Sequence, residues 1–178
     1  RSMANKQLLR AITIWQPFAS LVAVGVKPVE NRMWSPRASE LRVGQFVAIH
    51  AGSKYDRDSW EYVVMLSKRL KREGRWIPRR EAPWPISTIK PSRDTDSADV
   101  TPYGAIIGVA VLDEVRAEPR VFRDDNGEYE DPWWCGPVGW YMRDPVPFAA
   151  VPCSGSRGLW AVEGETLDVV RERYRAAR

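Results

Sequence analysis

The sequence has few of the residues that build disulfide frameworks, metal centres or membrane spans. Its 178 residues include two cysteines, Cys135 and Cys153, and a single histidine, His50. Two distant cysteines without paired spacing predict reduced thiols, with no metal and no cofactor. No apolar run approaches the roughly 20 residues of a membrane-spanning helix, and no signal-peptide pattern is present. We therefore expect a cytoplasmic protein, nuclear if eukaryotic, without a membrane partner.

The sequence also lacks internal repeats and the glycine-rich motifs that hold nucleotide phosphates. It has instead nine tryptophans, far above ordinary usage, and a net charge of +4. A modest positive charge permits a nucleic-acid partner but does not establish one. Tryptophan can fill a core, and its flat ring can also stack on a base.

The apolar periodicity predicts an α+β domain with several short strands and few helices. Strands are expected at residues 9–15, 29–34, 45–50, 104–115, 138–143, 146–151 and 159–162. The third should end in a turn at 51–52, and Asp144-Pro145 should separate the fifth from the sixth. Helices are expected at 18–24, 56–72 and 166–177, ended or capped by Gly25, Gly74 and Thr166 respectively. Residues 116–131 are expected to be a loop or a short helical segment.

The expected organisation is one domain at residues 9–164, with residues 165–178 as its C-terminal helix. Arg1 and Ser2 precede Met3 and are interpreted as a tag remnant, so residues 1–8 form a tail. Residues 76–101 are rich in proline and polar side chains without a period, which predicts a long inserted loop. That loop is either a lid or a solvated insertion. A monomer is the default expectation.

The most informative motif lies at residues 15–34 and reads WQPFASLVAVGVKPVENRMW. It resembles the signature of ASCH domains, named for homology to activating signal cointegrator. That signature has an aromatic residue or His before Gln-Pro, then an aromatic, Ala-Ser-Leu and Gly-x-Lys-x-x-Glu-x-Arg-x-Trp. Later segments resemble the family in the same order: QFVAIHAG, GAIIGVAVLDEV, GWYMRDPVPF and GLWAVEGE.

The resemblance implies a PUA-like small mixed β-barrel flanked by a few helices. Family members are linked to RNA processing, transcription coactivation and nucleic-acid binding, and some small bacterial members hydrolyse the acyl amide of acetylated cytidine. Their usual site is a cleft between the barrel and the helix after the first strand. The implied partner is a nucleic acid or a nucleobase-like ligand.

Lys27, Glu30 and Arg32 are the central candidate residues. In an extended segment Glu30 and Arg32 point to the same face, and Lys27 lies just before them. Arg32 could hold a phosphate or a base edge, and Lys27 could neutralise a phosphate or act as nucleophile or base. Glu30 could orient Lys27 or move a proton. Spacing alone favours a surface salt-bridge network, whereas the resemblance places these positions in the cleft.

Further candidates surround this group. Gln16 could read a base edge, Trp15 and Phe18 could stack or fill the core, and Ser20 after Pro17 could bond an anion or the backbone.

An aromatic wall could come from Trp34, Trp133, Trp134, Trp140 and Tyr141. His50 is expected to be a hydrogen-bonded residue at a strand end, with ligand contact as the alternative. The turn with Ser154, Ser156 and Arg157 could wrap a phosphate or be only a tight turn, and the basic run at 68–80 could follow a phosphate backbone or be a solvated helix face.

Two functions from different classes fit these residues. The first is a binding domain for RNA or single-stranded DNA, including modified bases, with a basic, aromatic-lined cleft. The second is a hydrolase, either an amidohydrolase on a modified nucleoside or a ribonuclease, with Lys27 and Glu30 as the reactive pair. The acetylcytidine-hydrolysing members carry a small hydroxyl residue where this chain has Glu30, which favours binding. A small-molecule sensor or a protein adaptor is a third possibility.

Overall fold

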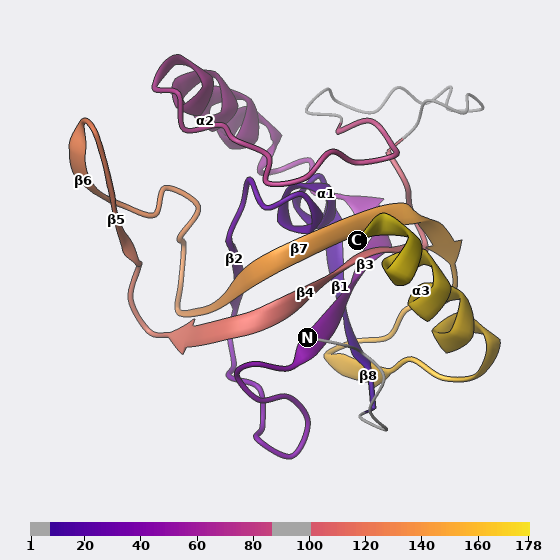
Figure 1. Cartoon of the computed structure of the whole chain (residues 1–178). Coiled ribbons are helices and arrows are strands. Elements are labelled where there is room, and N and C mark those ends of the chain that lie inside the picture. Colours follow the sequence, from indigo (N-terminus) through magenta and orange to yellow (C-terminus); the bar gives the residue numbers. More distant parts are fainter. Residues whose placement is uncertain (1–7, 87–100) are drawn as a thin grey trace.

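A six-stranded mixed sheet forms the centre of the computed structural model, which describes residues 8–86 and 101–178 (Figure 1). Its strand order is β2-β7-β4-β3-β1-β8, and a separate two-stranded sheet pairs β5 with β6. The strands are β1 (Arg10–Gln16), β2 (Val29–Arg32), β3 (Phe46–Tyr55), β4 (Ala105–Arg116), β5 (Val121–Asp124), β6 (Gly127–Glu130), β7 (Val138–Pro152) and β8 (Leu159–Ala161). The helices are α1 (Phe18–Ala23), α2 (Trp60–Arg72) and α3 (Gly164–Ala177). The predicted α+β class is confirmed.

The sheet is open, which differs from the closed barrel that the family resemblance implies. In the part of the chain that the structure describes, β2 and β8 are the two edge strands and do not pair with each other. The antiparallel pairing of β8 with β1 covers Arg10 to Ile12. Beyond it, the carbonyl oxygen of Thr13 accepts a hydrogen bond of 2.7 Å from Nη2 of Arg32. A side chain from β2 therefore bridges the gap where a closed barrel would have a ladder.

The short helix α1 packs its small apolar residues on the sheet. Residues 19–23 are all buried, and α1 contacts β1, β3, β4 and β7. Gly25 follows with a φ of 80°, a left-handed conformation that ends the helix as the sequence predicts. The chain then turns directly into β2, so α1 fixes where Lys27 enters the structure.

Two predicted strand ends are wrong. Strand β3 does not turn at residues 51–52 but continues to Tyr55, because β1 pairs with it in parallel through Ala51 and again at Tyr55. The two strands predicted around Asp144-Pro145 are one strand, β7. Asp144 has a φ of 49° and lies where the register between β4 and β7 shifts, so this break is a bulge within a continuous strand.

A hairpin occupies the segment predicted as a loop at 116–131. Strands β5 and β6 pair up to Asp124 and Gly127, and Gly127 has a φ of 107°. The overlooked signal is the dipeptide Asn126-Gly127, since Asn-Gly is a strong local indicator of a hairpin. Arg75 anchors the hairpin to the end of α2, with Nε 2.6 Å from Oδ2 of Asp124 and the guanidinium 3.8 Å from the ring centre of Tyr129.

The other two helices follow their predicted apolar patterns with shifted starts. Helix α2 begins at Trp60 instead of residue 56, because Asp56 accepts hydrogen bonds from the backbone and hydroxyl of Ser59 and holds a turn there. Helix α3 begins at Gly164, so Thr166 lies inside it and is not its cap. None of the helices among residues 8–86 and 101–178 is long and apolar enough to span a membrane.

The predicted insertion at 76–101 is partly packed on the domain. Trp84 is 9% exposed and its Nε1 donates a 3.0 Å hydrogen bond to the carbonyl of Phe148. Residues 87–100 lie outside the described residues, and so do residues 1–7, which include the expected tag remnant. Both alternatives for this loop, a lid and a solvated insertion, therefore remain predictions.

Gly139 in β7 provides a test of the packing under the 133–135 segment. A Cβ there would overlap the ring of Trp134 and lie 2.8 Å from Cγ2 of Val29. We expect Gly139→Ala to lower the free energy of unfolding by about 1–3 kcal/mol in urea titrations. In the double variant with Trp134→Ala the two effects should be less than additive, because the overlapping ring is gone. Simple additivity would contradict this packing.

Candidate functional site

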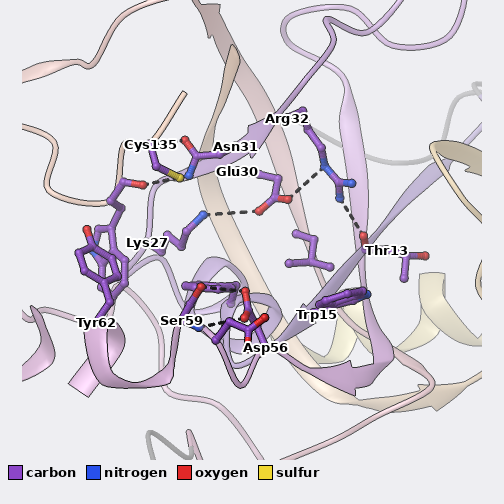
Figure 2. A pocket seen from close by; sticks show the side chains of 14 residues that line it. Thr13, Trp15, Lys27, Glu30, Asn31, Arg32, Asp56, Ser59, Tyr62 and Cys135 are labelled. Carbon is purple, nitrogen blue, oxygen red and sulfur yellow. Dashed lines mark hydrogen bonds and ion pairs between the residues drawn. The ribbon is translucent and has the colours of Figure 1, made fainter. Parts of the chain in front are cut away.

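A pocket of about 670 Å³ opens at the gap between β1 and β2. Its walls come from the end of β1, from Phe18 of α1, and from the turn and strand that carry Lys27, Glu30 and Arg32. The start of α2 and the segment at 133–135 complete it. Figure 2 shows Arg32, Thr13 and Trp15 on one side of this pocket, with Tyr62 and Cys135 on the opposite side. A cavity therefore lies beside the end of β1 and the start of α1.

Glu30 joins two cations in the floor of the pocket. Its Oε2 lies 3.5 Å from Nζ of Lys27, and its Oε1 lies 3.1 Å from Nε of Arg32. The N–H of Arg32 Nε is not aligned for a hydrogen bond, so this second contact is an ion pair. Lys27 and Glu30 are only 3% and 7% exposed, and buried charges require such partners. The predicted convergence of the three side chains is confirmed.

Both ends of this ionic group are tied to the backbone. Lys27 Nζ donates to the carbonyl of Val29, and Arg32 Nη2 donates to the carbonyl of Thr13. An ammonium has three N–H donors, so one donor of Lys27 is left for a ligand after Val29 and Glu30. The carboxylate of Glu30 likewise keeps acceptor capacity beside it. A donor and an acceptor thus stand side by side in the pocket.

Besides Tyr62, three aromatic rings line the pocket, and they come from three separate segments. Trp15 is 49% exposed, Phe18 lies 5.4 Å from Lys27 Nζ, and Trp133 is nearly buried. Asn31 holds the third ring in place, because its Nδ2 donates to the carbonyl of Trp133 and its Oδ1 accepts from the backbone of Cys135. The amide of Asn31 is therefore used for positioning.

The pocket is aromatic but it is not basic, which corrects the sequence-based expectation. Its described lining includes two cations, Lys27 and Arg32, and three carboxylates, Glu30, Asp56 and Asp58. The two aspartates lie at the start of α2 and had no place in the predicted site. Sequence reasoning missed them because only the tertiary fold brings α2 to β2. A negatively charged phosphate inside this pocket would meet more carboxylates than cations.

Tyr62 and Cys135 were also missed, and neither is an activated group. The hydroxyl of Tyr62 donates a 2.6 Å hydrogen bond to the carbonyl of Pro132, and burial raises the pKa of Tyr62. Burial likewise raises the pKa of the Cys135 thiol, so a reactive thiolate is disfavoured at neutral pH.

Gln16, Pro17 and Ser20 do not line the pocket as predicted. All three are buried: Gln16 ends β1, Pro17 is the N-cap of α1, and Ser20 lies in the first turn of α1. Oε1 of Gln16 accepts from the backbone of Ser20 at 3.1 Å, and its Nε2 donates to the carbonyl of Pro102 at 2.8 Å. Because both ends of this fully buried amide are bonded to backbone, Gln16 cannot read a base edge. It positions the helix behind the pocket.

The other tryptophans of the predicted wall pack in or on the core. Trp140 and Tyr141 are fully buried. Trp34 meets Trp140 edge to face at 4.9 Å, and its carbonyl accepts from Nε1 of Trp140. Trp134 lies over Gly139. The aromatic wall is therefore formed by Trp15, Phe18, Tyr62 and Trp133 and not by these four residues.

His50 and the turn at 154–158 lie beside the Thr13 edge but outside the pocket lining. His50 is 2% exposed and its Nε2 is 3.0 Å from the carbonyl of Cys153, so the predicted hydrogen bond exists, although within strand β3 and not at its end. In the turn, the carbonyl of Ser156 accepts from the hydroxyl of Thr13. Ser154, Ser156 and Arg157 are exposed there.

No cluster of three or more His, Cys, Asp or Glu side chains suited to a metal ion occurs within the described ranges. No protein-family model and no curated protein matches the sequence.

Among solved structures, the chain is similar to ASCH from Zymomonas mobilis, with a TM-score of 0.43, 11% identity and coverage of 90% of this chain and 91% of that one. A tyrosine-to-phenylalanine mutant of the same protein gives a TM-score of 0.45 at 12% identity, covering 93% of this chain and 98% of that one. A serine-to-alanine mutant gives 0.42 at 13% identity, covering 92% and 94%.

The single histidine gives a prediction for stability against pH. Burial lowers the pKa of His50, and Nδ1 has no hydrogen-bond partner among the described residues. The imidazole of His50 therefore binds a proton more readily in the unfolded chain than in the folded one. The free energy of unfolding keeps its full value above the ordinary pKa of 6.5 and falls as the pH drops below it. Urea unfolding between about pH 7 and pH 5 should show a loss of at most about 1.4 kcal/mol per pH unit. The curve of His50→Gln should be flatter, and parallel curves would contradict this assignment.

Proposed function

We propose that this chain is a nucleic-acid-binding domain of the ASCH type that holds one base of RNA or single-stranded DNA in the pocket between β1 and β2. The observation that carries the proposal is the buried Lys27–Glu30 pair, which faces a cavity lined by aromatic rings. A base needs the same two features, a flat apolar contact for its ring and paired polar groups for its edge.

The dimensions and polar groups support a base-sized ligand. A volume of about 670 Å³ lies within the usual range of small-molecule pockets. The free donor of Lys27 and the acceptor capacity of Glu30 can bond an edge that carries an acceptor next to a donor. Arg32 and Asn31 hold the surrounding backbone, so the two recognition groups are fixed before the ligand arrives.

The charge of the pocket decides which part of a nucleotide enters it. Asp56 and Asp58 outweigh the positive charge left by the Lys27–Glu30–Arg32 group. A neutral base fits this environment, whereas a phosphate is repelled and stays outside. We therefore expect the affinity for a free nucleoside to change little with salt, and the affinity for an oligonucleotide to fall with salt.

Substitution of the exposed ring tests base binding. Trp15→Ala should weaken binding of a nucleoside by about tenfold to a hundredfold in calorimetric titrations, because stacking on one ring contributes roughly 1–3 kcal/mol. The matched control is Val121→Ala, which also removes an exposed apolar side chain but lies on the β5–β6 hairpin. The titrations would use the common nucleosides, acetylated cytidine and short single strands of RNA and DNA. Equal affinities for the two variants, or no binding to the unaltered protein, would refute the proposal.

A hydrolase is the second candidate, favoured by one feature of the same pocket. Nζ of Lys27 and Oε2 of Glu30 are 3.5 Å apart, so a cation and a carboxylate stand together where a base would lie. Such a pair could serve general acid–base or nucleophilic chemistry on an acyl amide or a phosphodiester.

Product analysis separates the hydrolase from the binding domain. If acetylated cytidine is hydrolysed, Lys27→Met should abolish product while nearly preserving the side-chain volume. The control Arg173→Met removes an exposed cation of α3 that lines neither this pocket nor the face of α2, and it should leave turnover unchanged. Thermal unfolding of both variants checks that the fold is retained. Turnover that survives in Lys27→Met would exclude Lys27 as the reactive group.

A further inference from the structure

The outer face of α2 carries a second hollow, next to the pocket. This groove has a volume of about 530 Å³ and is lined by Tyr62, Met65, Lys68, Arg69 and Arg72 of the helix, together with Pro132. Tyr62 borders both the groove and the pocket, and its hydroxyl bonds the carbonyl of Pro132. The two hollows are therefore contiguous across one aromatic side chain. Figure 1 shows α2 at the outside of the fold, away from the central sheet.

The spacing of these residues places them on one side of the helix. Tyr62, Met65, Arg69 and Arg72 follow one another at intervals of three or four residues, which is the period of one helical face. The opposite face holds Val63 and Leu70 against the core. The groove face thus runs along the helix from the pocket rim to its last turn, a length of roughly 15 Å.

The cations of this face are available to a ligand. Arg69 forms an ion pair with Glu73 at 2.9 Å, so the charge of Arg69 is partly neutralised. Lys68 and Arg72 are exposed and form no ion pair within the described part of the chain. Met65 lies about one turn before Lys68 on the same side of the helix, with 62% of its area exposed. An exposed apolar side chain that is followed along the helix by two exposed cations suits a ligand with both apolar and charged groups.

Charge is also ordered along the helix. Carboxylates gather where α2 starts, at Asp56, Asp58 and Glu61, and cations gather over its last two turns. This order complements the helix dipole. It also separates a zone that repels phosphate, at the pocket, from a zone that attracts it, one or two turns further along.

We propose that the groove face of α2, from Tyr62 to Arg72, binds the phosphodiester backbone of the single strand whose base lies in the pocket. The inference rests on the proposed function, since it extends the ligand of the same site. The base enters beyond Tyr62, and the strand leaves past Tyr62 so that its next phosphates meet Lys68 and Arg72. Met65, which lies between Tyr62 and Lys68 along the helix, packs against the sugar or base on the pocket side of these phosphates. The acidic start of the helix fixes this exit direction, because a strand that left the pocket over the start of α2 would set its phosphates beside Asp58 and Glu61.

The experiment compares two double variants with equal charge change. Lys68→Gln with Arg72→Gln removes the free cations of the groove face. Arg173→Gln with Arg175→Gln removes two exposed cations from α3, which lies on a different side of the molecule (Figure 1). Each protein is titrated with one nucleoside by calorimetry, and with a labelled single-stranded RNA decamer by fluorescence anisotropy over a range of salt concentrations.

The groove variant should bind the decamer about tenfold more weakly than the α3 variant at low salt. The slope of its log affinity against log salt should be shallower by about 1.4, the value for two phosphate contacts on a single strand. Nucleoside affinity should be unchanged in both variants. This combination supports the phosphate path along α2.

Two other results would overturn the inference in distinguishable ways. If both variants bind the decamer with the same affinity and slope while nucleoside binding persists, the α2 face is only a solvated helix surface and the proposed function stands. If the unaltered protein binds neither the nucleoside nor the decamer, the proposed function fails and the inference fails with it. Circular dichroism melts confirm that the variants are folded, so that a loss of binding is not a loss of structure.

Discussion

The ion pair between Glu30 and its two cations is the contact on which the rest of the site depends. Glu30 is buried, and a carboxylate in that position is stable only when opposite charges replace the water it has lost. Lys27 and Arg32 supply those charges from either side along the chain. Each is in turn bonded to a backbone carbonyl, so the group fixes the turn before β2 and the approach of β2 to β1.

The open edge of the sheet explains why a cavity exists at this place. Strand β8 covers only the first part of β1, and β2 stays at the opposite edge of the sheet. A closed barrel would fill this gap with a ladder of backbone hydrogen bonds. Here the guanidinium of Arg32 spans it, which leaves room below for the rings of Trp15, Phe18 and Trp133. The same residue therefore stabilises the fold and lines the pocket.

Net charge and local charge differ in this protein. The chain is modestly basic overall, yet the lining of its central pocket includes more carboxylates than cations. The unpaired cations of α2 lie outside the pocket, on the face that begins at Tyr62. Composition reports only the sum of these charges. The division into a phosphate-repelling pocket and a phosphate-attracting helix face comes from how α2 is placed beside β2.

Local signals in the sequence were sufficient for the elements that depend on neighbours in the chain. The two-residue spacing of Glu30 and Arg32 predicted that both lie on one face of a strand. Gly25 ended α1 where a left-handed backbone conformation was needed. The apolar period of α2 selected Val63, Leu66 and Leu70 as its core face. Features that depend on a partner strand were not predicted, such as the extension of β3 beside β1 and the bulge at Asp144.

By itself the sequence determined the α+β class, the position of α1 and the group of Lys27, Glu30 and Arg32, because each follows from the spacing of nearby residues. Only the tertiary structure decided that Gln16 faces inward, that Trp140 is core, and that Asp58 and Tyr62 join the pocket. The physical reason is that periodicity fixes which side chains share a face. Long-range strand pairing and burial decide which faces meet, and both depend on residues that are far apart in the chain.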